Sequence, residues 1–258
     1  MWLKHYGEEF KEDPRLNIFH KIYISIFGIP ISGLRIRLRR ILPEIQGSFT
    51  SIVDLGCGKG VFTMELARRF PKSRVVGVDT DAEQVRVNNE VARRKGLRNV
   101  EFVVQDILTM SFDSEFDLAL SVDNLEHIEN DVEALARIRR ALKPGGKLVC
   151  HVPALERIWI FRKMARNFDV EGHVRAGYRL QELETRMREA GFNVKEIKPT
   201  YGYLETVSNN ISYLITGASQ KNALLYAFAF PVLNAMAWFG RKQNPKSRGA
   251  GVLAHAVR

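Results

Sequence analysis

The segment DLGCGKG, residues 54–60, constrains the fold of this chain more than any other feature. It follows a short apolar run, SIVDL, and precedes residues 61–70, whose apolar side chains recur at helical spacing. Because glycine has no Cβ, a loop with three glycines in seven residues can turn sharply and bring its backbone close to a ligand. A strand, such a loop and a helix in succession predict a nucleotide-type binding loop.

Short apolar runs alternate with helical patterns from residue 51 onward. The runs are rich in β-branched residues and bounded by turn residues, which suits the buried strands of a parallel sheet. We predict strands at 51–56, 74–79, 100–106, 116–122, 147–153, 193–199 and 251–257. We predict helices at 61–70, 82–96, 131–146 and 179–191, with Gly96 and Pro144-Gly145-Gly146 as stop signals. This pattern is typical of an α/β fold with a doubly wound sheet.

The glycine spacing of the loop is G-x-G-x-G and not the G-x-G-x-x-G of dinucleotide sites. Asp54 stands two residues before the first glycine, where its charge would repel a pyrophosphate. That carboxylate suits a ligand with an ammonium group instead.

Two further acids end predicted strands. Asp79 ends the second strand, where its carboxylate can accept hydrogen bonds from both hydroxyls of a ribose. Asp106 ends the third strand, where its carboxylate can accept a hydrogen bond from the exocyclic amine of adenine. Ile107 lies beside Asp106 and can cover the ring. Any one of these acids could be only a helix cap or a turn former. As a set they predict an adenosine that carries a cationic amino-acid tail.

The motifs VDLGCGKG, VVGVD, VVQDI, NLEHIEND and ALKPGGKLV follow one another in the order and spacing of a known family. On these motifs the chain resembles the class I S-adenosylmethionine-dependent methyltransferases, particularly the small-molecule "type 11" group that includes ubiquinone-pathway enzymes. The resemblance covers about residues 48–153. It implies a Rossmann-like, seven-stranded sheet whose last strand is antiparallel. It also implies methyl transfer from S-adenosylmethionine, with S-adenosylhomocysteine as the product.

The resemblance assigns cofactor contacts to individual residues of this chain. The methionine end belongs with the glycine loop, the ribose with Asp79, and the adenine with Thr80 and Asp106. The end of the fourth strand would pass beneath the sulfonium. The full expected set is Asp54, Gly56, Cys57, Gly58, Gly60, Asp79, Thr80, Asp106, Ile107, Ser121 and Val122.

These assignments divide the chain into parts. We expect an N-terminal helical arm at 1–47 and a methyltransferase domain at 48–258. Within the domain, 48–153 form the cofactor half, 154–199 the substrate half, 200–248 an apolar helical insertion and 249–258 the last strand.

The segment DNLEHIEND, residues 123–131, allows three interpretations. Asn130 or Asp131 can cap the next helix while the rest is a solvated loop. His127 can act as a general base or bind the substrate, since its imidazole titrates near neutral pH. Asp123, Glu126 and His127 can also hold a divalent metal, because ubiquinone-pathway O-methyltransferases, which are thought to use magnesium, have acid-x-x-Glu-His here. Most members of the wider group are metal-free, however.

A second polar segment, EGHVRAGY at 171–178, follows the fifth strand on the substrate side. His173, Arg175 and Tyr178 could grip an anionic or hydroxylated substrate, or they could only close the site and begin the next helix. Tyr201 and Tyr203, at the start of the insertion, are two more candidate substrate contacts.

Two apolar stretches, 18–31 and 223–239, suggest an interface. The second is slightly short for a bilayer crossing and contains Pro231, so we do not expect a full crossing. The arginine-rich segment 34–45 and the basic segment 241–248 flank them, as in a protein that lies on an anionic membrane. The alternative is a helical cap over the active site, or a dimer interface.

We therefore expect a cytoplasmic enzyme that methylates an oxygen, nitrogen or carbon of a small, amphiphilic or lipid-linked acceptor, as a monomer or homodimer. The apolar segments would bring it to the inner face of the membrane. Two distant cysteines and an N-terminus without the order of a signal peptide fit this compartment.

The net charge of +10 leaves RNA methylation as a rival function. Residues 121–125 nevertheless lack the Pro-Pro-aromatic pattern that grips a nucleobase amine, and Cys150 lies within a strand. A non-catalytic assembly protein that retains the cofactor site, or a nicotinamide dehydrogenase, would also be compatible with a glycine loop in this position.

Overall fold

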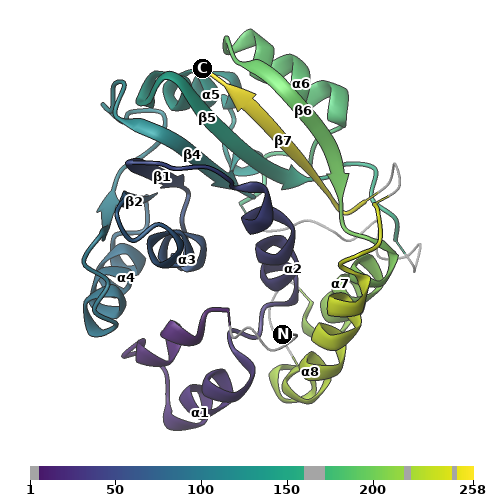
Figure 1. Ribbon diagram of the computed structural model, residues 1–258. Helices are drawn as coiled ribbons and strands as arrows, with labels where there is room; N and C mark the ends of the chain where they lie inside the picture. Colours follow the sequence, from purple (N-terminus) through teal and green to yellow (C-terminus); the bar gives the residue numbers. More distant parts are fainter. Residues whose placement is uncertain (1–5, 160–171, 218–221, 246–248) are drawn as a thin grey trace.

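The computed structural model describes residues 6–159, 172–217, 222–245 and 249–258 (Figure 1). Its centre is a seven-stranded sheet in the order β3-β2-β1-β4-β5-β7-β6. The strands are β1 Ser51–Leu55, β2 Arg74–Asp79, β3 Val100–Val104, β4 Phe116–Val122, β5 Leu142–Pro153, β6 Asn193–Thr200 and β7 Gly251–Val257. Strand β7 runs antiparallel to both of its neighbours, while β1 to β5 pair in parallel. The predicted fold class, with its antiparallel last strand, is confirmed.

Helices cover both faces of this sheet. They are α3 Val61–Arg69, α4 Ala82–Arg94, α5 Asp131–Ala141 and α6 Leu180–Glu189. Alternate residues of one strand face opposite sides, so Val53 packs in the cluster with Leu135 of α5, while Ile52 packs with Leu66 of α3. Burial of both faces explains why these strands are continuous apolar runs in the sequence.

Two predicted boundaries were wrong, namely the end of the third strand and the end of the helix that begins at residue 131. Strand β3 stops at Val104, so Asp106 lies in the loop beyond it. Helix α5 ends at Ala141, and the proline and glycines expected as its stop signal lie within β5. The pairing of β5 with β4 shifts register between Phe116 and Leu118, and Gly145 adopts a positive φ of 76° in this irregular stretch. The glycine pair thus serves a bulge in a strand and not the end of a helix.

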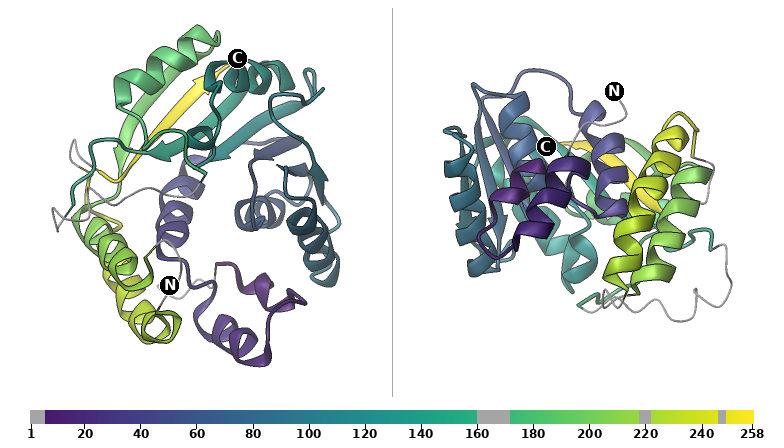
Figure 2. Two further views of the ribbon diagram at one scale, coloured as in Figure 1. Left: turned by 180° about the vertical axis from the view of Figure 1, so that it is seen from behind. Right: turned by 90° about the horizontal axis from the view of Figure 1, so that it is seen from below.

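The arm and the insertion form a helical layer on one side of the sheet (Figures 1 and 2). The arm contains the 3₁₀ turn η1 Glu8–Glu12, α1 Ile18–Phe27, α2 Ser32–Ile41 and the 3₁₀ turn η2 Leu42–Glu44. The insertion contains α7 Tyr203–Thr216 and α8 Ala223–Gly240, and α8 continues through Pro231. Lys246 and Arg248 of the basic segment lie outside the described residues.

The arginines of α2 correct the membrane interpretation of that helix. Arg35 is buried and donates to the carbonyl of Phe27 at 2.8 Å. Arg39 donates to Asn234 of α8 at 2.9 Å, and Arg40 pairs with Glu205 of α7 at 2.6 Å. These side chains therefore join the arm to the insertion and do not face a lipid surface.

The outer sides of α1 and α8 are apolar and exposed. Tyr23 of α1 donates to the carbonyl of Ala227 in α8 at 2.7 Å, so the two helices contact each other at the end of the molecule away from the sheet (Figure 1). Their exposed large apolar residues include Ile18, Phe19, Ile22 and Ile26 of α1 with Leu224, Leu225, Phe228 and Val232 of α8. We call this set the α1/α8 surface. Among the described residues, α8 alone has the length and apolar composition of a bilayer-spanning helix, and a third of it is buried.

Candidate active site

A pocket of about 290 Å³ opens at the carboxyl ends of β1, β2 and β3. In parallel α/β sheets this edge is where ligands bind, because the loops leave the strands there. The lining residues are Gly56, Val78, Asp79, Thr80, Gln105, Asp106, Ile107, Leu108, Asn124, His127, Ile128 and Glu129. Five of the expected cofactor residues line it, and so does His127.

The glycine loop forms one wall of the pocket. Gly56 has a positive φ of 69°, and a Cβ there would lie 2.4 Å from the side chain of Asn124. Gly60 has the same φ, and a Cβ there would lie 2.6 Å from the ring of Phe102. Only glycine satisfies both conditions, so the loop owes its shape to these two positions.

Asp79 ties this loop to β2. Its carboxylate accepts hydrogen bonds from the backbone N–H of Gly58 at 2.7 Å and of Asp81 at 3.0 Å. The side chain is still partly exposed to the pocket, as a ribose contact requires. Asp106 and Thr80 are exposed at the other end, and Asp106 accepts from the N–H of Leu108 at 2.8 Å.

Of the remaining predicted cofactor residues, Asp54, Gly60 and Ser121 are buried, whereas Cys57, Gly58 and Val122 are partly exposed. Asp54 is buried and accepts a hydrogen bond from Thr63 at 2.6 Å. Burial, helped by the negative charge of Asp79, raises the pKa of Asp54 to about 7. Burial likewise raises the pKa of the Cys57 thiol, which stays protonated. Ser121 is buried, and its hydroxyl has no hydrogen-bond partner among the described residues.

Sequence reasoning missed part of the pocket, namely Val78, Gln105, Leu108, Asn124, Ile128 and Glu129. Asn124 is the most informative of these, because it packs against the glycine loop from the end of a different strand. Nothing in its local pattern indicates that contact, which exists only because β4 lies beside β1.

Asp123 takes part in a separate network. Its carboxylate accepts from His151 Nδ1 at 2.7 Å and pairs with Arg37 of α2 at 2.8 Å, and the other ring nitrogen of His151 lies 2.9 Å from the hydroxyl of Thr200. Burial alone would raise the pKa of Asp123, but the charges of Arg37 and His151 lower it to about 2. Asp123 is thus engaged elsewhere, which argues against the alternative interpretation of Asp123, Glu126 and His127 as a metal site.

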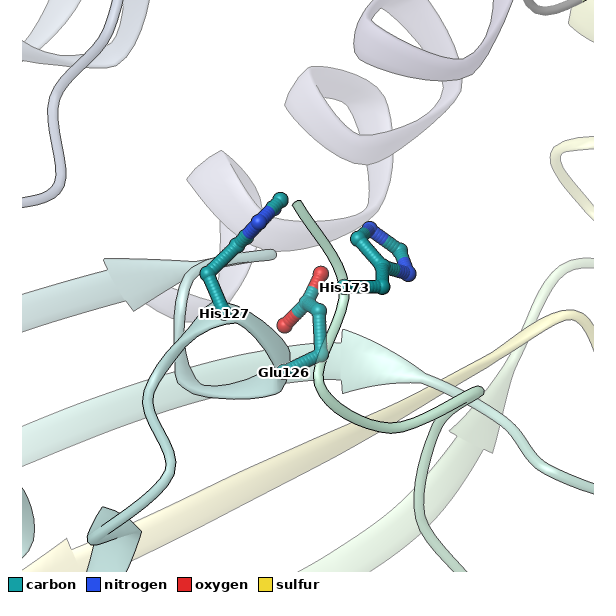
Figure 3. Close-up of side chains that lie close together, drawn as sticks. All are labelled: Glu126, His127 and His173. Atoms are coloured by element: carbon teal, nitrogen blue, oxygen red, sulfur yellow. The ribbon is translucent and has the colours of Figure 1, made fainter. Parts of the chain in front are cut away.

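His173 takes the place of Asp123 beside Glu126 and His127. Figure 3 shows the three side chains pointing toward one another, and their ligand atoms all lie within 4.8 Å. Glu126 and His127 belong to the 3₁₀ turn η3 Leu125–His127, and His173 follows the fifth strand. We call these three residues the Glu-His-His cluster.

The cluster combines a buried acid with two imidazoles. Burial, together with the charge of Asp123, raises the pKa of Glu126 to about 8. The ring of His173 lies edge-on to that of His127, with centroids 4.5 Å apart. Burial and the neighbouring His127 lower the pKa of His173, so its neutral form is favoured.

The end of the DNLEHIEND segment begins α5 as predicted. Asn130 is the N-cap, and its side chain accepts from the N–H of Glu133 at 3.4 Å. Asp131 is buried, and both of its carboxylate oxygens accept hydrogen bonds from side chains of residues 175–186. Arg175 and Tyr178 bind one oxygen, and Arg186 binds the other at 2.7 Å.

These contacts place two of the five candidate substrate residues in a structural network. Arg175 and Tyr178 hold the loop against Asp131, which gives them a structural role. Tyr203 is 67% exposed at the start of α7. Tyr201 is buried and donates to the carbonyl of Gly33 at 3.3 Å while it accepts from Arg37 at 3.4 Å, so it borders the Asp123 network. Of the five candidates, His173 alone lies in the Glu-His-His cluster.

Comparison with known proteins agrees with this geometry. A family model described as "Methyltransferase domain" matches residues 47–219, more than half of the chain. Trans-aconitate 2-methyltransferase of Deinococcus radiodurans is 37% identical over 117 residues, which cover 45% of this chain and 42% of that protein. (S)-coclaurine N-methyltransferase of Thalictrum flavum subsp. glaucum is 33% identical over 105 residues, covering 39% and 29%. The matches thus span less than half the length of these curated relatives.

Solved structures match over more of the chain. Geranyl diphosphate C-methyltransferase from Streptomyces coelicolor A3(2), in complex with Mg²⁺, geranyl-S-thiolodiphosphate and S-adenosyl-L-homocysteine, superposes with a TM-score of 0.60. The match covers 96% of this chain and 83% of that one at 19% identity. At this identity the likeness establishes the fold.

Proposed function

The chain belongs to the class I S-adenosylmethionine-dependent methyltransferases, and from this premise we propose that it methylates an oxygen, nitrogen or carbon of a small amphiphilic molecule. One observation carries the proposal. His127 lines the pocket that Asp79 and Asp106 also line, and it points toward Glu126 and His173. His127 thus belongs both to the pocket that fits the cofactor and to the Glu-His-His cluster.

The pocket residues fit S-adenosylmethionine. The carboxylate of Asp79 is exposed for the ribose hydroxyls, and Asp106 and Ile107 lie together for the adenine. The Gly58 N–H bond to Asp79 fixes the loop before the ligand arrives, which reduces the ordering cost of binding. The cofactor supplies a methyl group that is already activated by a positive sulfur.

The chain therefore has to align the acceptor and remove its proton where it has one. His127 Nδ1 lies 3.0 Å from the carbonyl of Gly172, which can only accept, so Nδ1 carries the hydrogen. Nε2 then has a free lone pair. We propose that Nε2 acts as a general base and takes up the proton of the acceptor.

The acceptor class follows from the outer surface. The α1/α8 surface exposes bulky apolar side chains, of which Phe19 is 78% and Phe228 76% exposed. Exposed apolar side chains grouped on two helices that contact each other indicate an interaction site. The positive net charge of +10 and the half-exposed Lys21 on α1 favour an anionic partner. We commit to the anionic inner face of a membrane as that partner, and to a lipid-linked acceptor held there.

Labelled transfer tests the proposal directly. The protein is incubated with methyl-labelled S-adenosylmethionine and either the lipid or the aqueous fraction of a cell extract. Label in the lipid fraction supports the full proposal, and label in the aqueous fraction alone rules out the lipid-linked acceptor. Cofactor binding without transfer to either fraction would favour a non-catalytic binding protein.

Asp79→Ala should weaken S-adenosylhomocysteine binding by about 10- to 100-fold, because hydrogen bonds to a charged group contribute about 1.5–3 kcal/mol. Titration calorimetry measures the affinity. Asp81→Ala is the matched control, because Asp81 caps α4 through Gln84 and leaves the pocket carboxylate in place. Equal affinities of Asp79→Ala and the wild type would refute the ribose assignment.

Vesicle flotation tests the α1/α8 surface. The wild type should float with vesicles of phosphatidylglycerol and less with phosphatidylcholine. The Phe19→Ser/Phe228→Ser variant should bind about tenfold or more weakly, since each buried aromatic side chain contributes about 1.5–3 kcal/mol. Val104→Ser, at an exposed position on the edge strand β3, is the control. Wild-type protein that stays unbound in both vesicle types would disprove a membrane partner.

A further inference from the structure

We propose that Glu126, His127 and His173 bind a divalent transition-metal ion. The proposal concerns the residues that face the acceptor, and its mechanistic meaning rests on the proposed function. The cation would lie beside the donor pocket, because His127 lines that pocket and belongs to the cluster as well.

The first argument is the geometry of the donor atoms. One atom from each of the three side chains lies within 4.8 Å of the other two, so a single ion can reach all three after small side-chain rotations. Two separate parts of the chain supply these atoms, the η3 turn and the segment after β5. The carbonyl of Glu126 holds the two parts together by accepting from the N–H of Val174 at 3.0 Å.

The second argument is the state of Glu126. The residue is only 1% exposed, and neither carboxylate oxygen has a hydrogen-bond partner in another described residue. A buried polar group without a partner costs about 1–3 kcal/mol, and more for a charged group. Buried polar groups in native proteins nearly always have a partner, and a bound ion is one such partner. The carboxylate lies between the two histidine side chains (Figure 3).

The third argument is the orientation of His127. Its Nδ1–H donates to the carbonyl of Gly172 at 3.0 Å, which leaves Nε2 as the free donor atom. Metal-binding histidines commonly make this bond from their other ring nitrogen, because it fixes the tautomer and the ring orientation. Since Gly172 adjoins His173, the same backbone segment orients one ligand and carries another.

The donor set indicates the kind of ion. Two imidazoles and one carboxylate favour Mn²⁺, Fe²⁺, Co²⁺ or Zn²⁺ over Mg²⁺ and Ca²⁺, which prefer oxygen ligands. Three protein ligands leave coordination positions open, as in catalytic metal sites. An acceptor hydroxyl could fill such a position and lose its proton to water more easily. Its oxygen would then bond to the methyl carbon as the sulfur–carbon bond breaks, which releases S-adenosylhomocysteine. With the ion in place, Nε2 of His127 would act as a ligand, and the ion would activate the acceptor in its stead.

A second group of similar composition gives a useful contrast. Glu44, Glu196 and His255 also place ligand atoms within 4.8 Å of one another. Lys198 already lies there, however, and donates to Glu44 at 3.2 Å and to Glu196 at 3.1 Å. The ammonium group already occupies the place of a cation and partly offsets the charge of these two acids, so this group serves as an internal control.

Mn²⁺ binding, without cofactor or acceptor, tests the proposal. Calorimetry and the loss of the free-ion electron paramagnetic resonance signal should both report one ion per wild-type chain. Glu126→Gln and His173→Ala should each weaken binding by about 10- to 100-fold, whereas Glu44→Gln should bind as the wild type does. Circular dichroism and S-adenosylhomocysteine affinity establish that the variants are folded.

Either of two results would overturn the proposal: no stoichiometric ion in the wild type, or one whose affinity is the same in Glu126→Gln and His173→Ala. The readout is independent of methyl transfer. A protein that binds Mn²⁺ through the cluster but methylates nothing would refute the proposed function alone. Methyl transfer that persists in a variant that no longer binds the ion would refute only the catalytic role of the ion.

Discussion

His127→Ala should lose methyl transfer by a factor on the order of 10² to 10⁴, the usual contribution of a positioned acid–base group, while it binds S-adenosylhomocysteine within a few-fold of the wild type. The ring is at the edge of the cofactor pocket, and Asp79 and Asp106 remain in place without it. Steady-state kinetics with labelled cofactor, alongside calorimetry of the product complex, separates the two effects. A variant that turns over at the wild-type rate would return His127 to a purely structural role.

Two conservative variants sharpen this test. An asparagine amide can imitate Nδ1 and still donate to the carbonyl of Gly172, but it has no atom in place of Nε2. A glutamine amide can approach the position of Nε2 but cannot take up a proton. If Nε2 acts chemically, His127→Asn and His127→Gln both lose activity. If the bond to Gly172 is all that matters, His127→Asn keeps it.

Glu205→Ala should destabilise the protein by about 3–5 kcal/mol, because it leaves the largely buried Arg40 without its counter-charge. Glu205 is fully buried, and one oxygen accepts from Arg40 at 2.6 Å and from the N–H of Gly202 at 2.8 Å. The residue thus joins α2 to α7 and also caps α7. Urea unfolding measures the free energy, provided that the transition is two-state.

The control for Glu205 is an exposed ion pair of similar geometry. Glu184 pairs with Arg188 along α6 at 2.7 Å, and both side chains are partly or largely exposed to water. Glu184→Ala should therefore change the free energy of unfolding by no more than about 0.5 kcal/mol. A Glu205→Ala variant that stays within this range would mean that the arm and the insertion are held by apolar packing alone.

Much of the fold could be predicted from local pattern. The β-branched runs and the helical spacing between them placed the five parallel strands, because buried parallel strands must be apolar on both faces. The two antiparallel strands β6 and β7 were also placed. The errors fell where a local signal has two meanings. Pro144 and the glycines after it can end a helix or form a bulge, and the pairing of β5 with β4 decided for the bulge.

The cofactor side of the site was also predictable to a large extent. Parallel strands send their carboxyl ends to the same edge, so acids that follow successive strands must meet there. Asp79 and Asp106 line one pocket for this reason, together with Gly56. Asp54 also lies near the carboxyl end of a parallel strand, but its side chain is buried and accepts a hydrogen bond from Thr63 of α3. The direction of this side chain therefore depends on the packing of α3.

The sequence by itself determined the sheet, the glycine loop and the edge at which the ligand binds, since each depends on neighbouring residues and on the alternation of strand and helix. Only the tertiary structure decided which polar groups meet on the acceptor side. In the folded protein Arg37 forms an ion pair with Asp123, Arg175 forms an ion pair with Asp131, and His173 lies close to Glu126. These partners come from distant segments, and their pairing depends on how the arm, the insertion and the loop after β5 pack, which no local pattern records.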